Sequence, residues 1–222
     1  MFNSLLPLIV LAALLRPAVA EEPEDIDGAS RAFARYVANV QHAGSWSPET
    51  IDIEASLPKL QKRGHLRAIR RLNQAGNADY QVLEIAGDRT VRQQVIERYL
   101  TAQVTASEIP AASVAMTPEN YQFRYQGMVH DGDVVAYVFQ IKPRKKRIGL
   151  ISGELWLDAD TGAAVRQSGR LVKSPSLFVK SVGITRETVL SEGVAQRLLT
   201  HLSVDTRLVG LANLTVTESP LR

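Results

Sequence analysis

Cysteine is absent from the 222-residue sequence. Its absence excludes a disulfide framework, a thiolate nucleophile and a Cys-ligated metal, and it also excludes the lipid-modified cysteine of a lipoprotein. An excess of one charge is lacking as well, because 26 Lys and Arg stand against 23 Asp and Glu. The resulting net charge of +3 is too small to indicate a nucleic-acid partner.

Common enzyme signatures are missing. The four histidines, His42, His65, His130 and His201, form no HExxH or HxH pair, and no GxSxG, GxGxxG or GxxxxGK[ST] sequence occurs. We therefore expect a protein that is not an enzyme and that needs no metal or cofactor. A hydrolase remains a lesser alternative, since catalytic partners that are distant in sequence can meet in space.

The bulk composition is that of an ordinary globular protein, with 45% hydrophobic and 22% charged residues. The N-terminus differs. Its apolar run 4–15 is too short for a comfortable bilayer span, and it precedes Ala18-Val19-Ala20, which fits the signal-peptidase rule. We expect a signal peptide over 1–20 that is cleaved after Ala20, a single domain over 21–222, and a periplasmic location. An uncleaved anchor is the alternative, because no Lys or Arg lies in the first fifteen residues.

Hydrophobic spacing indicates both helices and strands. It predicts helices over 29–41 and 90–103, the second with Thr90 as a possible cap, and strands over 50–57, 65–73 and 79–87. Residues 104–120, rich in Ala, Ser and Pro, are expected to form a loop. From Tyr121 onward, short alternating runs separated by turn residues predict consecutive antiparallel strands. Such a meander needs cover on one face, so we expect an α+β fold with a large curved antiparallel sheet holding the helices on its concave side.

The sequence Asp158-Ala-Asp-Thr-Gly162 lies between two of these runs. An EF-hand loop fails here, because its third ligand position is occupied by Gly162 and no Glu follows at the required distance. A catalytic pair of Asp158 and Asp160 needs burial to separate the two pKa values, which a polar tip does not offer. The stretch is therefore predicted to be a hairpin turn.

Aromatic residues gather on the predicted strands that follow Tyr121. On adjacent strands they share faces with β-branched residues, and Trp156 follows nearby. Such a stripe indicates either an ordinary core under a helix or the wall of an apolar cavity for an acyl chain. The candidate lipid-binding wall consists of Tyr121, Phe123, Tyr125, Tyr137, Phe139 and Trp156.

One charge run stands out, in the sequence KPRKKR over 142–147. It falls between two predicted strands. It can be a solvated turn, or it can contact anionic lipid headgroups or an acidic protein partner. The candidate contact residues are Lys142, Arg144, Lys145, Lys146 and Arg147.

Residues 121–182 resemble the LolA-like superfamily of outer-membrane lipoprotein-sorting proteins and periplasmic lipoprotein carriers. The resemblance is carried by a hairpin with Gly153, Leu155, Trp156, Leu157, Asp158, Thr161 and Gly162 in the family's order. It implies an incomplete antiparallel barrel wrapped over helices around an apolar cavity. It also implies non-enzymatic binding of a lipid or a lipid-modified protein in the periplasm.

Two functions thus remain. The first is a periplasmic carrier that shelters acyl chains. The alternative is a periplasmic sensor or protein-interaction module with the same fold.

Overall fold

The structure is a computed structural model of the whole chain, and it describes residues 25–42, 49–72, 78–132, 134–191 and 194–221. The predicted signal peptide over 1–20 lies outside these described residues. None of the helices in the described part of the chain has the length and apolar character that a bilayer crossing requires.

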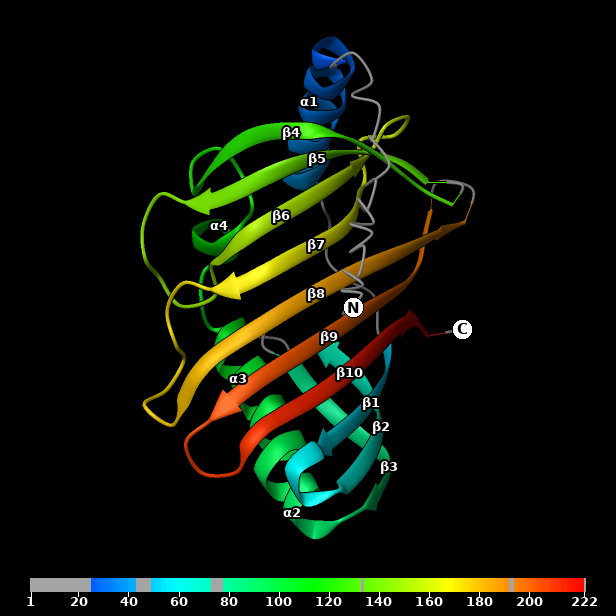
Figure 1. Cartoon of the computed structure of the whole chain (residues 1–222). Coiled ribbons are helices and arrows are strands. Elements are labelled where there is room, and N and C mark those ends of the chain that lie inside the picture. The colour runs from blue at the N-terminus through cyan, green and yellow to red at the C-terminus, as the bar shows by residue number, and fades with distance from the viewer. Residues whose placement is uncertain (1–24, 43–48, 73–77, 133, 192–193, 222) are drawn as a thin grey trace, which may run out of the picture.

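All ten strands belong to one antiparallel sheet in the order β3-β2-β1-β10-β9-β8-β7-β6-β5-β4 (Figure 1). Because β3 and β4 are its two edges, the sheet does not close, and the expected α+β fold with an incomplete barrel is confirmed. The strands are β1 Glu49–Leu57, β2 Lys62–Leu72, β3 Ala78–Gly87, β4 Tyr121–Asp131, β5 Val134–Pro143, β6 Ile151–Asp158, β7 Ala164–Leu171, β8 Val179–Ser191, β9 Val194–Thr206 and β10 Gly210–Pro220.

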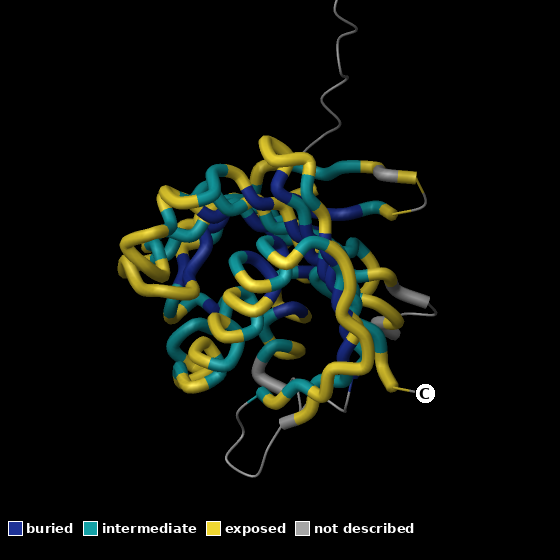
Figure 2. The backbone as a smooth tube through the Cα atoms, turned by 90° about the horizontal axis from the view of Figure 1, so that it is seen from below, coloured by how far each residue is buried: buried dark blue, intermediate teal, exposed yellow. Residues whose placement is uncertain are grey.

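The helices lie on one face of this sheet, at its two ends (Figure 1). Helix α1 spans Ile26–His42, close to the predicted range. The second helical segment comprises α2 Arg89–Val91, a π-helical stretch Arg92–Ile96 and α3 Glu97–Ser107. Seen from below, the strands curve around these helices (Figure 2).

The sequence prediction was wrong at two points of the helical region. Asp88, rather than Thr90, caps the second segment, because its carboxylate accepts the backbone N–H of Thr90 at 2.7 Å. The expected loop over 104–120 is partly helical, since α3 continues to Ser107 and α4 spans Ala111–Val114. The alanines of this stretch favour helix, and Pro110 interrupts it between the two.

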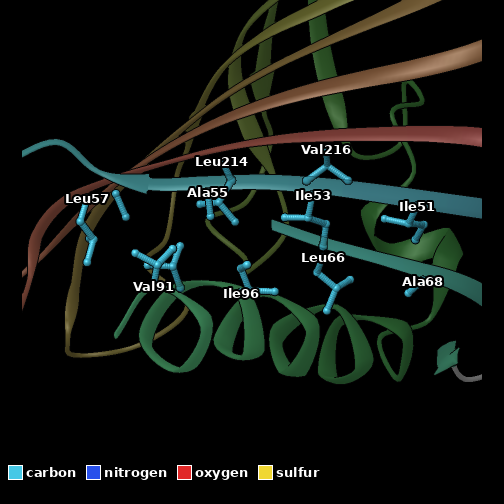
Figure 3. Packing of buried hydrophobic residues seen from close by; sticks show 12 residues of the cluster. Ile51, Ile53, Ala55, Leu57, Leu66, Ala68, Val91, Ile96, Leu214 and Val216 are labelled. Carbon is cyan, nitrogen blue, oxygen red and sulfur yellow. The ribbon is translucent and has the colours of Figure 1, made fainter. Parts of the chain in front are cut away.

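A first core lies beneath α2 and α3. Alternate residues of β1 point to one side, which buries Ile51 and Ile53 against the helix, and Leu66 joins them from β2 (Figure 3). Val91 and Ile96 fill the helix side of this core. The inward-facing residues of the strands and of the helical segment thus form one apolar layer.

A second core lies beneath α1, over β4, β5 and β6. Ala29, Ala32 and Tyr36 of α1 pack on the aromatic residues of these strands. Asp25 holds the beginning of the helix, because it accepts the backbone N–H of Gly28 at 2.7 Å and the hydroxyl of Tyr137. That second bond raises the pKa of Tyr137 to about 12, so the phenol stays protonated and keeps donating.

The middle strands lie between these two helix-covered ends. Their inner face carries a smaller cluster of Ile151, Val182 and Ile184. The Tyr121 hydroxyl reaches it from the α1 side and accepts the backbone N–H of Ile151 at 3.1 Å. The inner face therefore continues from one core to the other.

Candidate functional site

A cavity of about 410 Å³ opens on the inner face of the sheet. It lies between α3 and residues of β2, β3, β8, β9 and β10. Its volume lies within the range typical of small-molecule sites. It is lined by Arg70, Arg71, Ala78, Tyr80, Tyr99, Gln103, Ala106, Ser107, Ile184, Arg186, Leu198, Thr200, Leu202 and Glu218.

The apolar part of the lining comes from three directions. Ile184 on β8 and Leu202 on β9 are cross-strand neighbours and form the floor, and Tyr99 of α3 faces the strands. Burial raises the pKa of the Tyr99 phenol, which is therefore neutral at physiological pH. The cavity can accordingly contact hydrocarbon without exposing a charge on this side.

Arg186 is the polar feature at the centre of the inner face. It follows Val182 and Ile184 in the inward phase of β8, and its direct neighbours are Gln167 on β7 and Thr200 on β9. Its side chain is exposed and makes no ion pair with any residue that the structure describes. A guanidinium in this setting is available to an anionic group of a ligand.

The charge of Arg186 acts on both cores. Burial raises the pKa values of Tyr99 and Tyr121, and the nearby guanidinium opposes the rise in each case. Arg186 thus lies between the α3 side and the α1 side of the inner face.

A second arginine of the lining is already neutralised. Arg70 pairs with Glu49, and its Nη1 lies 3.2 Å from Oε1 of Glu218. Burial raises the pKa of Glu49, which the charge of Arg70 opposes. Because Arg70 is balanced by carboxylates while Arg186 and Arg71 are not paired within the described chain, the cavity has a net positive lining.

The structure brings together five of the six aromatic residues of the candidate wall. Tyr121, Tyr137 and Phe139 are buried under α1, and Phe123 and Tyr125 are partly buried beside them. The ring of Phe33 on α1 lies 4.8 Å from that of Phe123 and 5.4 Å from that of Phe139. None of the six lines the cavity under α3, and their contact with lipid remains a prediction.

Trp156 lies apart from the other five. Successive residues of a strand point to opposite faces, and Leu155 and Leu157 take the inward positions, so Trp156 points outward. There the guanidinium carbon of Arg166 lies 4.9 Å from its ring centroid.

The basic residues 142–147 are placed at the end of β5 and in the loop that follows it, and the five candidate contact residues are exposed. Arg144 is tied down, because its Nε donates to the carbonyl oxygens of Pro118 at 2.7 Å and Tyr121 at 3.1 Å. A headgroup or partner contact of this run remains a prediction.

The hairpin prediction for Asp158–Gly162 is confirmed. Asp158 accepts the backbone N–H of Thr161 at 2.8 Å, and Gly162 adopts a φ of 72°. A Cβ at Gly162 would lie 2.6 Å from the carbonyl oxygen of Ala32, so the turn packs directly against α1. Within the described ranges no group of three His, Asp or Glu side chains could hold a metal.

A second hollow of about 570 Å³ lies on the outer face of β1, β2, β3 and β10. Its lining includes Glu54, Ser56, Arg63, His65 and Asn213, and all of its lining residues come from strands. The cavity under α3, by contrast, lies between a helix and the sheet, and we take it as the candidate site.

The residues of this cavity were not predicted from the sequence. They come from five strands and a helix, and a single sequence does not show that these segments meet. The sequence did contain one indication of the site. Arg186 follows Val182 and Ile184 at alternate positions of one strand, so it points to the same, inward face as these two apolar residues.

No family model matches the sequence, and no curated protein matches it either. Among solved structures, a LolA superfamily protein from Nitrosomonas europaea is 11% identical, with 87% of this chain and 93% of that chain covered and a TM-score of 0.38. A putative outer membrane lipoprotein-sorting protein domain from Vibrio parahaemolyticus is 11% identical, with 88% and 90% covered and a TM-score of 0.38. The MucA/MucB complex of Pseudomonas aeruginosa is 12% identical, with 88% and 94% covered and a TM-score of 0.25.

Two of these names belong to the superfamily that residues 121–182 resemble. At such identities and TM-scores, however, the likeness carries no argument about function. The functional proposal therefore rests on the residues of the site.

Proposed function

We propose that this protein is a non-enzymatic carrier that binds an anionic lipid or the acyl chains of a lipid-modified protein in the cavity under α3. The observation that carries the proposal is the guanidinium of Arg186, which has no ion-pair partner in the described part of the chain and lies at the edge of an apolar floor. An amphiphile with a hydrocarbon chain and an anionic head matches that arrangement.

The energetics fit a reversible carrier. Each methylene that leaves water for the apolar lining contributes about 0.8 kcal/mol. A charge-assisted hydrogen bond from Arg186 to a carboxylate or phosphate adds about 1.5–3 kcal/mol and fixes which end of the ligand lies at the centre of the sheet.

The aromatic residues under α1 are proposed as a continuation of the lipid-binding wall. Supporting this, the hydrogen bond between Tyr121 and the backbone of Ile151 joins the α1 core to the middle strands. A chain longer than the cavity would extend along this path toward Phe123 and Phe139.

Export belongs to the same proposal. A carrier of this kind would work in the periplasm as one domain over 21–222, after cleavage of residues 1–20. The intact mass of the exported protein tests this step, because cleavage gives a chain that starts at Glu21 and an uncleaved anchor gives one that starts at Met1.

The binding test is a titration of the purified protein with a fluorescent fatty acid. The proposal predicts one saturable site, and Arg186→Met weakens binding by roughly 10- to 100-fold, since the loss of a charged hydrogen bond is about 1.5–3 kcal/mol. Arg170→Met is the matched control, because Arg170 is an exposed arginine on the outward phase of the adjacent strand β7. An unsaturable signal, or equal affinities of the two variants, would contradict the proposal.

A second function is favoured by a separate observation, the exposed edge strand β3. Val82, Leu83 and Ile85 are exposed on this edge, and a strand of a partner protein can add to such an edge. In that case the chain would be a sensor or protein-interaction module, with residues 142–147 meeting an acidic partner. Leu83→Lys would then abolish partner capture and leave fatty-acid affinity unchanged.

A further inference from the structure

Four loops meet at one end of the sheet, the end at the left of Figure 1. They join β1 to β2, β5 to β6, β7 to β8, and β9 to β10, and we call them together the basic loop end. The loops comprise residues 58–61, 144–150, 172–178 and 207–209.

Specific contacts hold three of these loops side by side. The backbone N–H of Arg207 donates to the carbonyl oxygen of Phe178 at 2.9 Å, and its Nε donates to that of Leu177 at 3.0 Å. Gly210, where β10 begins, lies close to the side chain of Lys59. The fourth loop, 144–150, adjoins them, because the backbone N–H of Val172 donates to the carbonyl oxygen of Leu150 at 3.0 Å.

Large apolar side chains project from this surface. Leu177 is 89% exposed, Leu208 62%, Phe178 54% and Leu60 49%. Arg207 holds the backbone of Leu177 and Phe178 in place, so their exposure is built into the loop contacts. Apolar side chains grouped in this way indicate an interaction surface.

The charge of the four loops has one sign, with Glu119 near Arg144 as an acidic neighbour at the same end. The four loops contain no Asp or Glu, whereas Lys59, Arg144, Lys145, Lys146, Arg147, Lys173 and Arg207 all fall within them. At the other end of the strands, the described loop 159–163 contains no Lys or Arg.

We propose that the basic loop end docks on the surface of an anionic lipid bilayer. Leu177, Phe178 and Leu208 enter the region between headgroups and acyl chains, while the lysines and arginines lie at the phosphates. The basic side chains of this surface complement the negative charge of the headgroups. Its few projecting apolar side chains complement the apolar region beneath them. None of these residues lines the cavity under α3, so the proposal does not depend on the ligand of that cavity.

The test is co-flotation of the exported protein with vesicles. One set is made of phosphatidylcholine alone, and the other of equimolar phosphatidylcholine and phosphatidylglycerol. The wild type is expected to float with the anionic vesicles, to stay behind with the neutral ones, and to be released by high salt, because screening shortens the reach of the basic side chains.

Variants separate the contributions. The triple variant Leu177→Ser, Phe178→Ser, Leu208→Ser is expected to lose at least tenfold in vesicle affinity, and so is Lys145→Glu with Lys146→Glu. Leu83→Ser is the matched control, since it removes an exposed leucine on β3, away from these loops, and it should float like the wild type. Arg186→Met should also float normally, which distinguishes this proposal from the cavity proposal.

A local probe adds a second readout. Leu208→Trp should show a blue shift of its emission with anionic vesicles and none with neutral ones. Failure of the wild type to float with anionic vesicles, or equal flotation of the triple variant and the wild type, would overturn the proposal. Capture of an acidic protein by a chain that ignores both vesicles would overturn it too, and would identify this end as a protein interface.

Discussion

Gly153 on β6 lies directly opposite Gly169 on β7, and a Cβ at Gly153 would lie 2.0 Å from the carbonyl oxygen of Ser168. The two strands approach so closely at this pair that neither position has room for a side chain. The glycine pair sits on the inner face between Ile141 on β5 and Ile184 on β8, where the α1 core gives way to the middle strands.

Substitution at this pair should therefore be costly. Gly153→Ala is expected to lower the free energy of unfolding by about 1–3 kcal/mol, because the methyl group forces the two backbones apart. Urea denaturation measures the change. Gly183→Ala is the control on β8, where the nearest atom to an added Cβ is 3.8 Å away, and its stability should stay near that of the wild type.

The assignment of faces on β6 gives a second prediction. Leu155 is fully buried in the α1 core, so Leu155→Ala should lower the free energy of unfolding by about 2–5 kcal/mol. Leu177→Ala makes the same chemical change on a side chain that is 89% exposed, and it should have little effect. Equal losses in the two variants would contradict the placement of β6 under α1.

The ion pairs of Arg70 at the edge of the cavity give a third prediction. Arg70→Met leaves Glu49 and Glu218 without their counterion, and their side chains are only 6% and 11% exposed. Breaking a buried pair in this way should lower the free energy of unfolding by about 3–5 kcal/mol. Arg67→Met removes an exposed arginine of the same strand, β2, that pairs with Asp52 on β1, and it should have only a small effect. A similar loss in both variants would argue against burial of the Arg70 group.

Asp52 gives a prediction for pH. Burial raises the pKa of its carboxyl, but the hydrogen bonds from Arg67 and His65 outweigh burial and bring the pKa below the ordinary 3.8. A carboxyl with a lowered pKa in the folded state stabilises the fold above its unfolded pKa, and that contribution is lost as the pH falls through the folded value. The stability difference between the wild type and Asp52→Asn should thus be present above 3.8 and shrink as the pH falls below it. A difference independent of acid pH would contradict the pairing.

Local patterns sufficed for much of the fold. The alternation of Ile51 and Ile53 predicted β1, and the Asp158–Gly162 turn predicted the hairpin of β6 and β7, because both depend on neighbouring residues. Which helix covers which strands could not be predicted, since α1 packs on strands about a hundred residues further along the chain. Trp156 was grouped with the aromatic wall because it is close in sequence, but its strand phase points it outward.

The cavity could not be predicted from the sequence. Arg186 is recognised as a site residue only because Tyr99 on α3 and Thr200 on β9 line the same cavity. The pattern of a single strand does not show that these residues meet. Its inward phase on β8 was visible, whereas the absence of a carboxylate partner among the described residues needed the structure.

The central claim is that the cavity under α3 holds an acyl chain, and a filled cavity tests it most directly. Ala106 lines the cavity, whereas Ala102, which is one turn earlier on α3, does not line it. In a fluorescent fatty-acid titration, Ala106→Trp should abolish saturable binding, while Ala102→Trp should bind like the wild type with the same unfolding midpoint. Undiminished binding by a folded Ala106→Trp variant would contradict the claim.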